Sequence, residues 1–157
     1  MHVVYARKGI GGVSLGLAAG FVFTENMNIN NISKEAEEKV LQILNKKSVE
    51  NVKKIPSKQG VYLIYKKSKI IYVGKGRNLN RRINNNHLSV GSEGSTSIFR
   101  SKIHKIYKKP FGRTMKKWIL NNCTFAYEEI EDKDLCSLVE ALLIIFLRKK
   151  GVKLLND

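Results

Sequence analysis

The pattern of hydrophobic and polar positions predicts a β-hairpin in the middle of the chain. Two runs rich in valine, isoleucine and tyrosine, residues 60–65 and 69–73, are separated only by the polar residues 66–68. Such runs around a short polar stretch are typical of paired antiparallel strands. We expect an odd loop register, a three-residue loop, which sets Tyr62 directly opposite Tyr72 with both phenols on one face. A two- or four-residue loop would put them on opposite faces.

Helical periodicity predicts helices before and after this hairpin. Ser33 is the expected N-cap of a first helix that runs to about residue 47 and packs on the domain through an apolar stripe. After the hairpin, Asn78 is expected to cap a basic helix with Leu79 and Ile83 on its inner side. The stripe of the first helix consists of Ala36, Val40, Ile43 and Leu44.

The remainder of the chain predicts one more strand between helices. Residues 84–94 are polar and predict a loop, residues 95–97 offer N-cap hydroxyls for a helix to residue 107, and a short helix over 113–120 follows. A strand over 123–130 and a last helix over 135–149 complete the order β-β-α-α-α-β-α, which predicts an α+β fold: a small three-stranded antiparallel sheet flanked by helices. Trp118 and Ile119 are expected to be buried, Asp134 to cap the last helix and Gly151 to end it.

Charge points to a polyanionic partner. The 157 residues include 29 Lys and Arg against 13 Asp and Glu, a formal net charge of +16. Nucleic acid is the leading candidate, an anionic membrane surface the second, and solubility alone the third. Cys123 and Cys136 have neither metal-site nor disulfide spacing, so reduced thiols and a cytoplasmic location are expected.

The N-terminal residues 1–26 are interpreted as an extension of doubtful function. Residues 9–23 carry no charge and follow Arg7 and Lys8. This stretch is short for a membrane span, rich in glycine, and lacks a clear signal-peptidase pattern, so no stable membrane partner is expected. An alternative is that Met27 is the true start.

The hairpin carries a tyrosine and a glycine in each strand. Gly60-Val61-Tyr62 and Tyr72-Val73-Gly74 place the tyrosines ten positions apart, and a basic helix follows. This pair closely resembles the signature of GIY-YIG nucleases, with valine in place of isoleucine in both halves, and the resemblance extends from about Gly60 to the C-terminus. It implies the GIY-YIG nuclease fold, with the two tyrosines in the active site and Gly60 and Gly74 supporting them.

The resemblance also implies roles for the basic residues after the second tyrosine. The family's catalytic arginine typically follows that tyrosine by ten residues, which selects Arg82. Its planar, permanently charged fork suits two phosphate oxygens and the charge that develops in phosphoryl transfer. Arg77 and Arg81 are expected to bind phosphates without taking part in catalysis. Lys75 matches a lysine in some members and would lower a phenol's pKa or contact phosphate.

Glu140 is the candidate metal ligand. Its helix is apolar nearly all round and is therefore expected to be buried, where an unpaired carboxylate needs a partner or a cation. Mg²⁺ binds through one or two carboxylates and keeps several waters, and the family places one metal-binding glutamate on such a late helix. One Mg²⁺ or Mn²⁺ per active site is therefore expected. The alternative is a glutamate on a narrow polar stripe with Ser137 and Arg148.

Five further positions complete the candidate site. Asn156 resembles the asparagine with which such domains often close and would position the glutamate or a phosphate. Many members have a histidine four residues after the arginine; here Asn86 stands there and His87 comes one later, about 100° away on an α-helix. A smaller family group suggests phosphate binding at a helix start, here by Ser95, Thr96 and Arg100.

These observations predict a metal-dependent DNA endonuclease with a single active site. The catalytic domain would span 55–157, preceded by a helical segment over 27–54. DNA is the expected partner, with RNA open, and the protein is expected to be a monomer or weak homodimer. The alternative is a nucleic-acid-binding protein on a GIY-YIG scaffold that no longer cuts.

Overall fold

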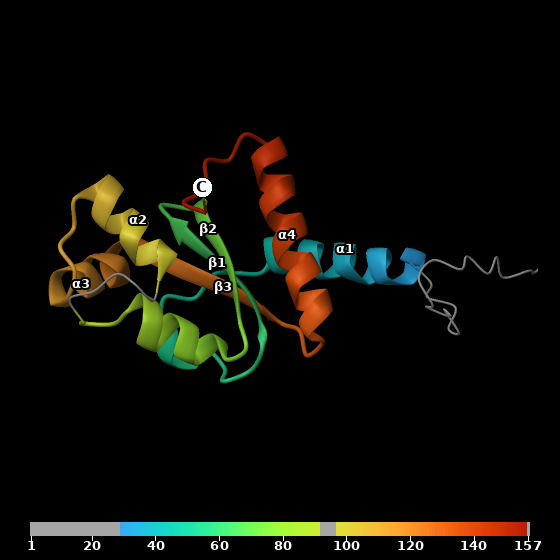
Figure 1. Ribbon diagram of the computed structural model, residues 1–157, viewed down its shortest axis with the longest axis horizontal. Coiled ribbons are helices and arrows are strands. Elements are labelled where there is room, and N and C mark those ends of the chain that lie inside the picture. The colour runs from blue at the N-terminus through green and yellow to red at the C-terminus, as the bar shows by residue number, and fades with distance from the viewer. Residues whose placement is uncertain (1–28, 92–96, 157) are drawn as a thin grey trace, which may run out of the picture.

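A three-stranded antiparallel sheet forms the centre of the molecule (Figure 1). The computed structural model describes residues 29–91 and 97–156, so the extension 1–26, Ser95 and Thr96 lie outside the described part. The strands are β1 (Gly60–Lys66), β2 (Lys69–Gly76) and β3 (Cys123–Glu129), in the order β2-β1-β3. The predicted α+β fold and its element order are therefore confirmed.

The hairpin loop between β1 and β2 is shorter than the sequence suggested. Lys67 and Ser68 both have positive φ, 48° and 62°, which makes a two-residue turn of the kind whose twist matches the flanking strands. The predicted three-residue loop is wrong. A β-bulge at Ile71 follows, because Ile64 pairs with Tyr72 while the next residue of β1 pairs with Ile70.

The bulge brings Tyr72 to the face of Tyr62, which the two-residue loop alone would not have done. An extra residue shifts the alternation of side chains by one position, so Tyr72 comes back to the face that carries Tyr62. Tyr62 pairs with Gly74, not with Tyr72, and the two tyrosines lie diagonally with ring centroids 6.3 Å apart. The prediction of a shared face is confirmed, although the register behind it differs.

Two layers of helices cover the sheet, one on each face. On the face of the tyrosines lie η2 (Arg81–His87), α2 (Ile98–Tyr107) and α3 (Arg113–Asn122); a short 3₁₀ turn, η1 (Val52–Lys54), precedes β1. The other face packs against α1 (Ile29–Asn45) and α4 (Lys133–Lys149), which lie together at the opposite end of Figure 1 from α2 and α3. The sheet therefore separates two hydrophobic cores.

Each core is built from the side chains that the strand alternation directs to it. The first includes Ile64, Leu79, Ile83, Phe99, Ile103, Met115, Ile119 and Phe125 besides the tyrosines. The second joins Val61, Leu63, Val73 and Ala126 to Ala36, Val40 and Ile43 of α1 and to Val139, Leu143 and Leu147 of α4. The predicted stripe of the first helix is thus buried, with Leu44 partly so. Trp118 is only half-buried, against the ring of Tyr107.

The ends of three helices differ in detail from the sequence expectation. Ser33 lies inside α1, which begins at Ile29. Asp132, not Asp134, caps α4 by accepting the Leu135 backbone N–H at 2.6 Å. Asn78 does accept a backbone N–H at the start of its helix, from the residue three positions on at 2.8 Å.

Gly151 ends α4 as predicted. Its φ is +76°, the left-handed conformation that glycine adopts without a steric penalty. Its N–H bonds the carbonyl of Arg148, and the N–H of Val152 bonds that of Leu147. This pair of bonds is the Schellman motif, which satisfies the carbonyls at a helix end. The α4 helix is not buried all round as expected, since the apolar side chains of Ile145 and Phe146 are exposed.

None of the helices in residues 29–91 and 97–156 combines the length and apolar character that a membrane crossing requires.

Candidate active site

Tyr62 and Tyr72 lie on the face of the hairpin that η2 and α2 cover. Tyr62 is fully buried and Tyr72 is 4% exposed. Tyr62 fits because its strand partner is glycine: a Cβ at Gly74 would lie 2.5 Å from Cζ of the phenol ring. Glycine is also required at position 60, since a Cβ there would overlap the carbonyl group of Glu128 on β3. Both glycines therefore allow close approach, one to a side chain and one to a strand.

The helix that carries Arg82 is wound as a π-helix over residues 81–87. The Leu88 N–H bonds the carbonyl of Ile83, five positions back, at 3.0 Å. This wider winding accommodates an extra residue within the turn and is frequent at functional sites. Arg82 and His87, five positions apart, consequently reach the same phenol. The α-helical geometry, which would have turned His87 away, does not apply.

The phenol of Tyr62 is the point where these side chains meet. His87 Nε2 lies 2.5 Å from Tyr62 Oη, and Arg82 Nε donates to the same oxygen at 3.3 Å. Arg82 also hydrogen-bonds Tyr72, as does Tyr62 itself. The rings of Tyr62, Tyr72 and His87 lie within 6.3 Å of one another by their centroids.

Ser97, which the sequence did not single out alone, completes this cluster. Its Oγ caps α2 by accepting the Arg100 backbone N–H at 3.2 Å and lies 2.7 Å from His87 Nδ1. A buried hydroxyl needs an acceptor for its own proton, and His87 Nδ1 is within reach. The imidazole then carries hydrogen on Nε2 and donates it to Tyr62. Hydrogen-bond donation then runs from Ser97 to His87, from His87 to Tyr62 and from Tyr62 to Tyr72.

Protonation of the cluster follows from burial and from two arginines. Burial raises the pKa of both phenols, strongly for Tyr62, and Arg82 opposes that rise in each case. Burial, with the positive charges of Arg82 and Arg100, holds the pKa of His87 well below its usual value, so the imidazole is neutral at pH 7. At pH 7 the cluster therefore consists of two neutral phenols, the neutral imidazole of His87 and the charged guanidinium of Arg82.

Lys75 and Glu140 form a second group at the edge of β2. Their Nζ and Oε2 lie 3.1 Å apart, and Lys75 also donates to Ser137 Oγ at 2.9 Å. The cation that opposes the rise in phenol pKa is Arg82, so the suggestion that Lys75 lowers it is not supported. Glu140 is 23% exposed on its side chain and close enough to influence both tyrosines electrostatically. Within the described residues, no three His, Cys, Asp or Glu side chains cluster as a metal site.

Asn156 supports the hairpin through the backbone of β2. Its Oδ1 accepts the Val73 N–H at 2.9 Å and its Nδ2 donates to the Val73 carbonyl at 2.7 Å. The Leu155 N–H adds a bond to the carbonyl of Ile71 at 2.7 Å. The chain end thus covers the outer edge of β2 on either side of Tyr72. That Asn156 also positions the glutamate or a phosphate stays a prediction beside this structural role.

The predicted phosphate-binding arginines divide into exposed and buried. Arg77 and Arg81 are exposed and, with Arg82 and Asn86, line an open pocket of about 210 Å³ beside Gly76. Arg100 is 1% exposed, and its Nη2 donates to the Gly91 carbonyl at 2.6 Å. The Arg100 guanidinium is thus bound to the backbone at Gly91, and a contact of Arg100 with nucleic acid stays a prediction.

Sheet, tyrosines, arginine and late glutamate together define a nuclease-type site. The family model for the GIY-YIG catalytic domain matches residues 58–151. The chain therefore belongs to the GIY-YIG family of nucleases, which act on nucleic acid and generally depend on a divalent metal. No curated protein and no solved structure matches the chain.

Proposed function

We propose that the protein is a metal-dependent DNA endonuclease with one active site per chain. The observation that carries this proposal is the convergence of Arg82 and His87 on the paired phenols of Tyr62 and Tyr72. A guanidinium beside two hydroxyls, next to an open pocket lined by further arginines, suits a phosphate group under attack by water. Water would attack phosphorus in line, and the arginine would stabilise the charge that develops.

Tyr72, reacting as its phenolate, is the better general base of the two tyrosines and would take the proton of the attacking water. It accepts hydrogen bonds from Arg82 and from Tyr62, and hydrogen bonds to the charged form of a group favour that form. Its ring is also the less enclosed of the two. Tyr62 and His87 would then act as positioning residues that fix the Tyr72 oxygen, with Ser97 fixing the tautomer of His87.

Glu140 fits a hard divalent cation. It offers carboxylate oxygens at a partly exposed position, and Mg²⁺ commonly takes one or two carboxylates and completes its shell with water and substrate phosphate. The ion pair with Lys75 shows that the carboxylate already balances a positive charge here. When bound, the metal would supply Lewis-acid stabilisation of the scissile phosphate. Mn²⁺ has the same oxygen preference.

The test is a nicking assay on supercoiled plasmid in Mg²⁺ and in EDTA. Wild type is expected to nick one strand per event in Mg²⁺ only, since each chain has one site. Glu140→Ala should abolish cleavage while DNA binding survives. Arg82→Ala should slow the single-turnover rate by on the order of 10²–10³-fold, as for loss of one transition-state contact.

Matched controls separate these roles from charge alone. Glu131→Ala removes an exposed carboxylate just before α4 and should nick at the wild-type rate. Arg81→Ala removes the exposed neighbour of Arg82 and should weaken binding without slowing cleavage at saturating DNA. Undiminished cleavage by Glu140→Ala would show that another group binds the metal. Binding of DNA without nicking by wild type would favour the non-catalytic alternative, and cleavage of RNA alone would change the substrate.

A cytoplasmic location is part of the same proposal. Cys123 and Cys136 are buried free thiols, which suits a reducing compartment. Fractionation of cells that express the tagged protein tests this assignment. A single site per chain suits a monomer or weak homodimer, which light scattering measures.

A further inference from the structure

Charge is unevenly distributed along the chain and therefore across the fold. Between residues 51 and 127 the sequence contains 18 Lys and Arg and a single acidic residue, Glu93. This segment includes the hairpin, η2, α2 and α3, the layer on the tyrosine face of the sheet. All other acidic residues belong to the segments before and after it, which include α1, the end of β3 and α4. The two ends of the molecule in Figure 1 consequently differ in charge.

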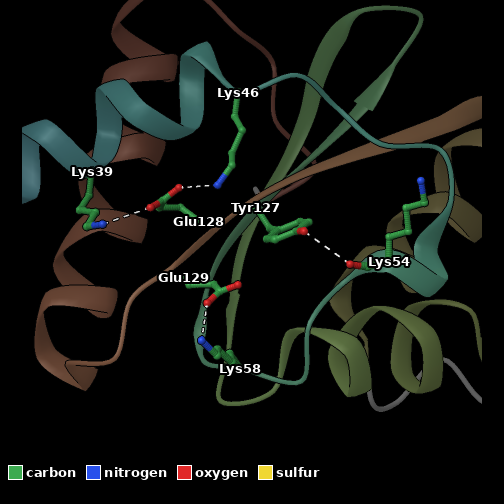
Figure 2. Close-up of polar contacts among 7 residues, drawn as sticks. All are labelled: Lys39, Lys46, Lys54, Lys58, Tyr127, Glu128 and Glu129. Carbon is green, nitrogen blue, oxygen red and sulfur yellow. Dashed lines mark hydrogen bonds and ion pairs between the residues drawn. The ribbon is translucent and has the colours of Figure 1, made fainter.

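The acidic residues of β3 are paired with lysines from their own surroundings. Glu128 binds Lys39 at 3.1 Å and Lys46 at 2.8 Å, both from α1, and Glu129 binds Lys58 at 3.0 Å (Figure 2). Four exposed basic residues of this region, Lys105, Lys108, Arg113 and Lys117, take part in none of the ion pairs between described residues. These ion pairs therefore leave the charge of the four side chains uncompensated.

We define the α2–α3 basic surface as four exposed residues, Lys105, Lys108, Arg113 and Lys117. Arg113 and Lys117 lie four positions apart on α3, where like charges repel. Lys108 has φ +53° and ψ 35°, the left-handed conformation at the end of α2 where glycine is preferred. A lysine at that position costs stability, and its charge adds further repulsion. Such a surface suits a polyanion that offsets both costs.

The surface is connected to the active site by α2 itself. The helix begins beside Ser97, which contacts His87, and ends at Lys108. At 1.5 Å per residue this is about 15 Å. Duplex DNA carries one phosphate per strand every 3.4 Å along its axis, so this distance corresponds to roughly four to five base pairs.

We propose that DNA bound at the active site extends along α2, and that the α2–α3 basic surface holds its phosphates roughly four to five base pairs from the scissile bond. This inference rests on the proposed function for the position of the scissile phosphate. It assigns a binding surface beyond Arg77 and Arg81, formed by residues that contact none of the catalytic side chains. The interaction is with the backbone, so it carries no sequence preference.

The test is the salt dependence of binding to a labelled duplex, measured by fluorescence anisotropy in EDTA. The surface variant combines Lys105→Gln, Lys108→Gly and Lys117→Gln. The control combines Lys34→Gln, Lys47→Gln and Lys149→Gln, which removes the same charge from exposed positions at the α1–α4 end. The log–log slope should become shallower by about 2.7 in the surface variant, at 0.9 per lost phosphate contact, and should stay at the wild-type value in the control.

The single variant Lys108→Gly removes one charge of the surface without destabilising the fold. It should keep the melting temperature at or above that of wild type, because glycine suits the left-handed position, while the slope falls by about 0.9. Equal slopes for the surface variant and the control would overturn the proposal. Nicking by wild type in Mg²⁺ is scored separately. A protein that fails to nick but shows the slope difference would refute the nuclease assignment and support the surface.

Discussion

Mild acid should destabilise the fold through one buried histidine. The imidazole of His87 is fully buried, bonded to Tyr62 and Ser97, with the charges of Arg82 and Arg100 near it. Burial first, and then these two cations, hold the pKa of His87 well below its ordinary value of 6.5. A proton added there would face two positive charges in a site that water does not reach.

The sign and size of the change in stability with pH follow from the linkage between protonation and folding. The unfolded chain takes up this proton as the pH falls through about 6.5, while the folded chain does not. The stability from neutral His87 is therefore fully present above pH 6.5 and is lost progressively below it. The loss for one proton is about 1.4 kcal/mol at pH 5.5 and about 2 kcal/mol at pH 5. Glu128, whose pKa is lowered from 4.5 although burial opposes this, contributes only at lower pH.

Urea denaturation at pH 7.5, 6.5, 5.5 and 5.0 measures this loss. Wild type and His104→Gln, which removes an exposed histidine, should both lose stability over this range. His87→Gln should be less stable at pH 7.5 because its amide replaces the imidazole bonds imperfectly, yet its stability should barely change between pH 6.5 and 5. A wild-type stability that stays constant to pH 5, or the same pH slope in His87→Gln, would refute the reasoning.

Three substitutions test how the hairpin is held. Gly74→Ala should cost about 1–3 kcal/mol in urea denaturation and disturb tyrosine fluorescence, because its Cβ overlaps the ring of Tyr62; an unchanged midpoint would contradict the close packing. Asn156→Leu should cost about 1–3 kcal/mol through two lost hydrogen bonds to β2, with Asn156→Asp as the partial-loss comparison. Lys67→Asn with Ser68→Gly should raise stability by about 1 kcal/mol, since both positions have positive φ; a lower melting temperature would count against the two-residue turn.

The fold was predictable because its signals are local. Alternating runs around a polar turn, a terminal glycine after a helix and an asparagine before one each depend on a few neighbouring residues. The turn length and the bulge at Ile71 were not predictable, because they compensate each other: a shorter loop with one extra strand residue leaves the same side chains on the same face. Only the shared face, and not the register, followed from the pattern.

The site was predictable where spacing along a regular element decides position. Tyr62, Tyr72 and Arg82 come together as the tripeptide pair indicated. The contact of His87 was not derivable, because π-helical winding is not encoded in hydrophobic periodicity. The burial of Arg100 was not derivable, because charge alone does not distinguish a solvated guanidinium from a buried one. Ser97 had a signal, its place among three hydroxyls before a helix, but only the structure joins it to the imidazole.

The two-layer construction makes catalytic competence a property of the whole chain. Arg82 and His87 approach the tyrosines from one side of the sheet, while Glu140 belongs to α4, which packs against the opposite side. On the ribosome, the hairpin and η2 emerge well before β3 and α4, so a nascent chain has Arg82 and His87 before it has Glu140. If Glu140 holds the metal, as we propose, the metal site is complete only when the last helix docks on the sheet. The order of synthesis would then delay cleavage until α4 has folded.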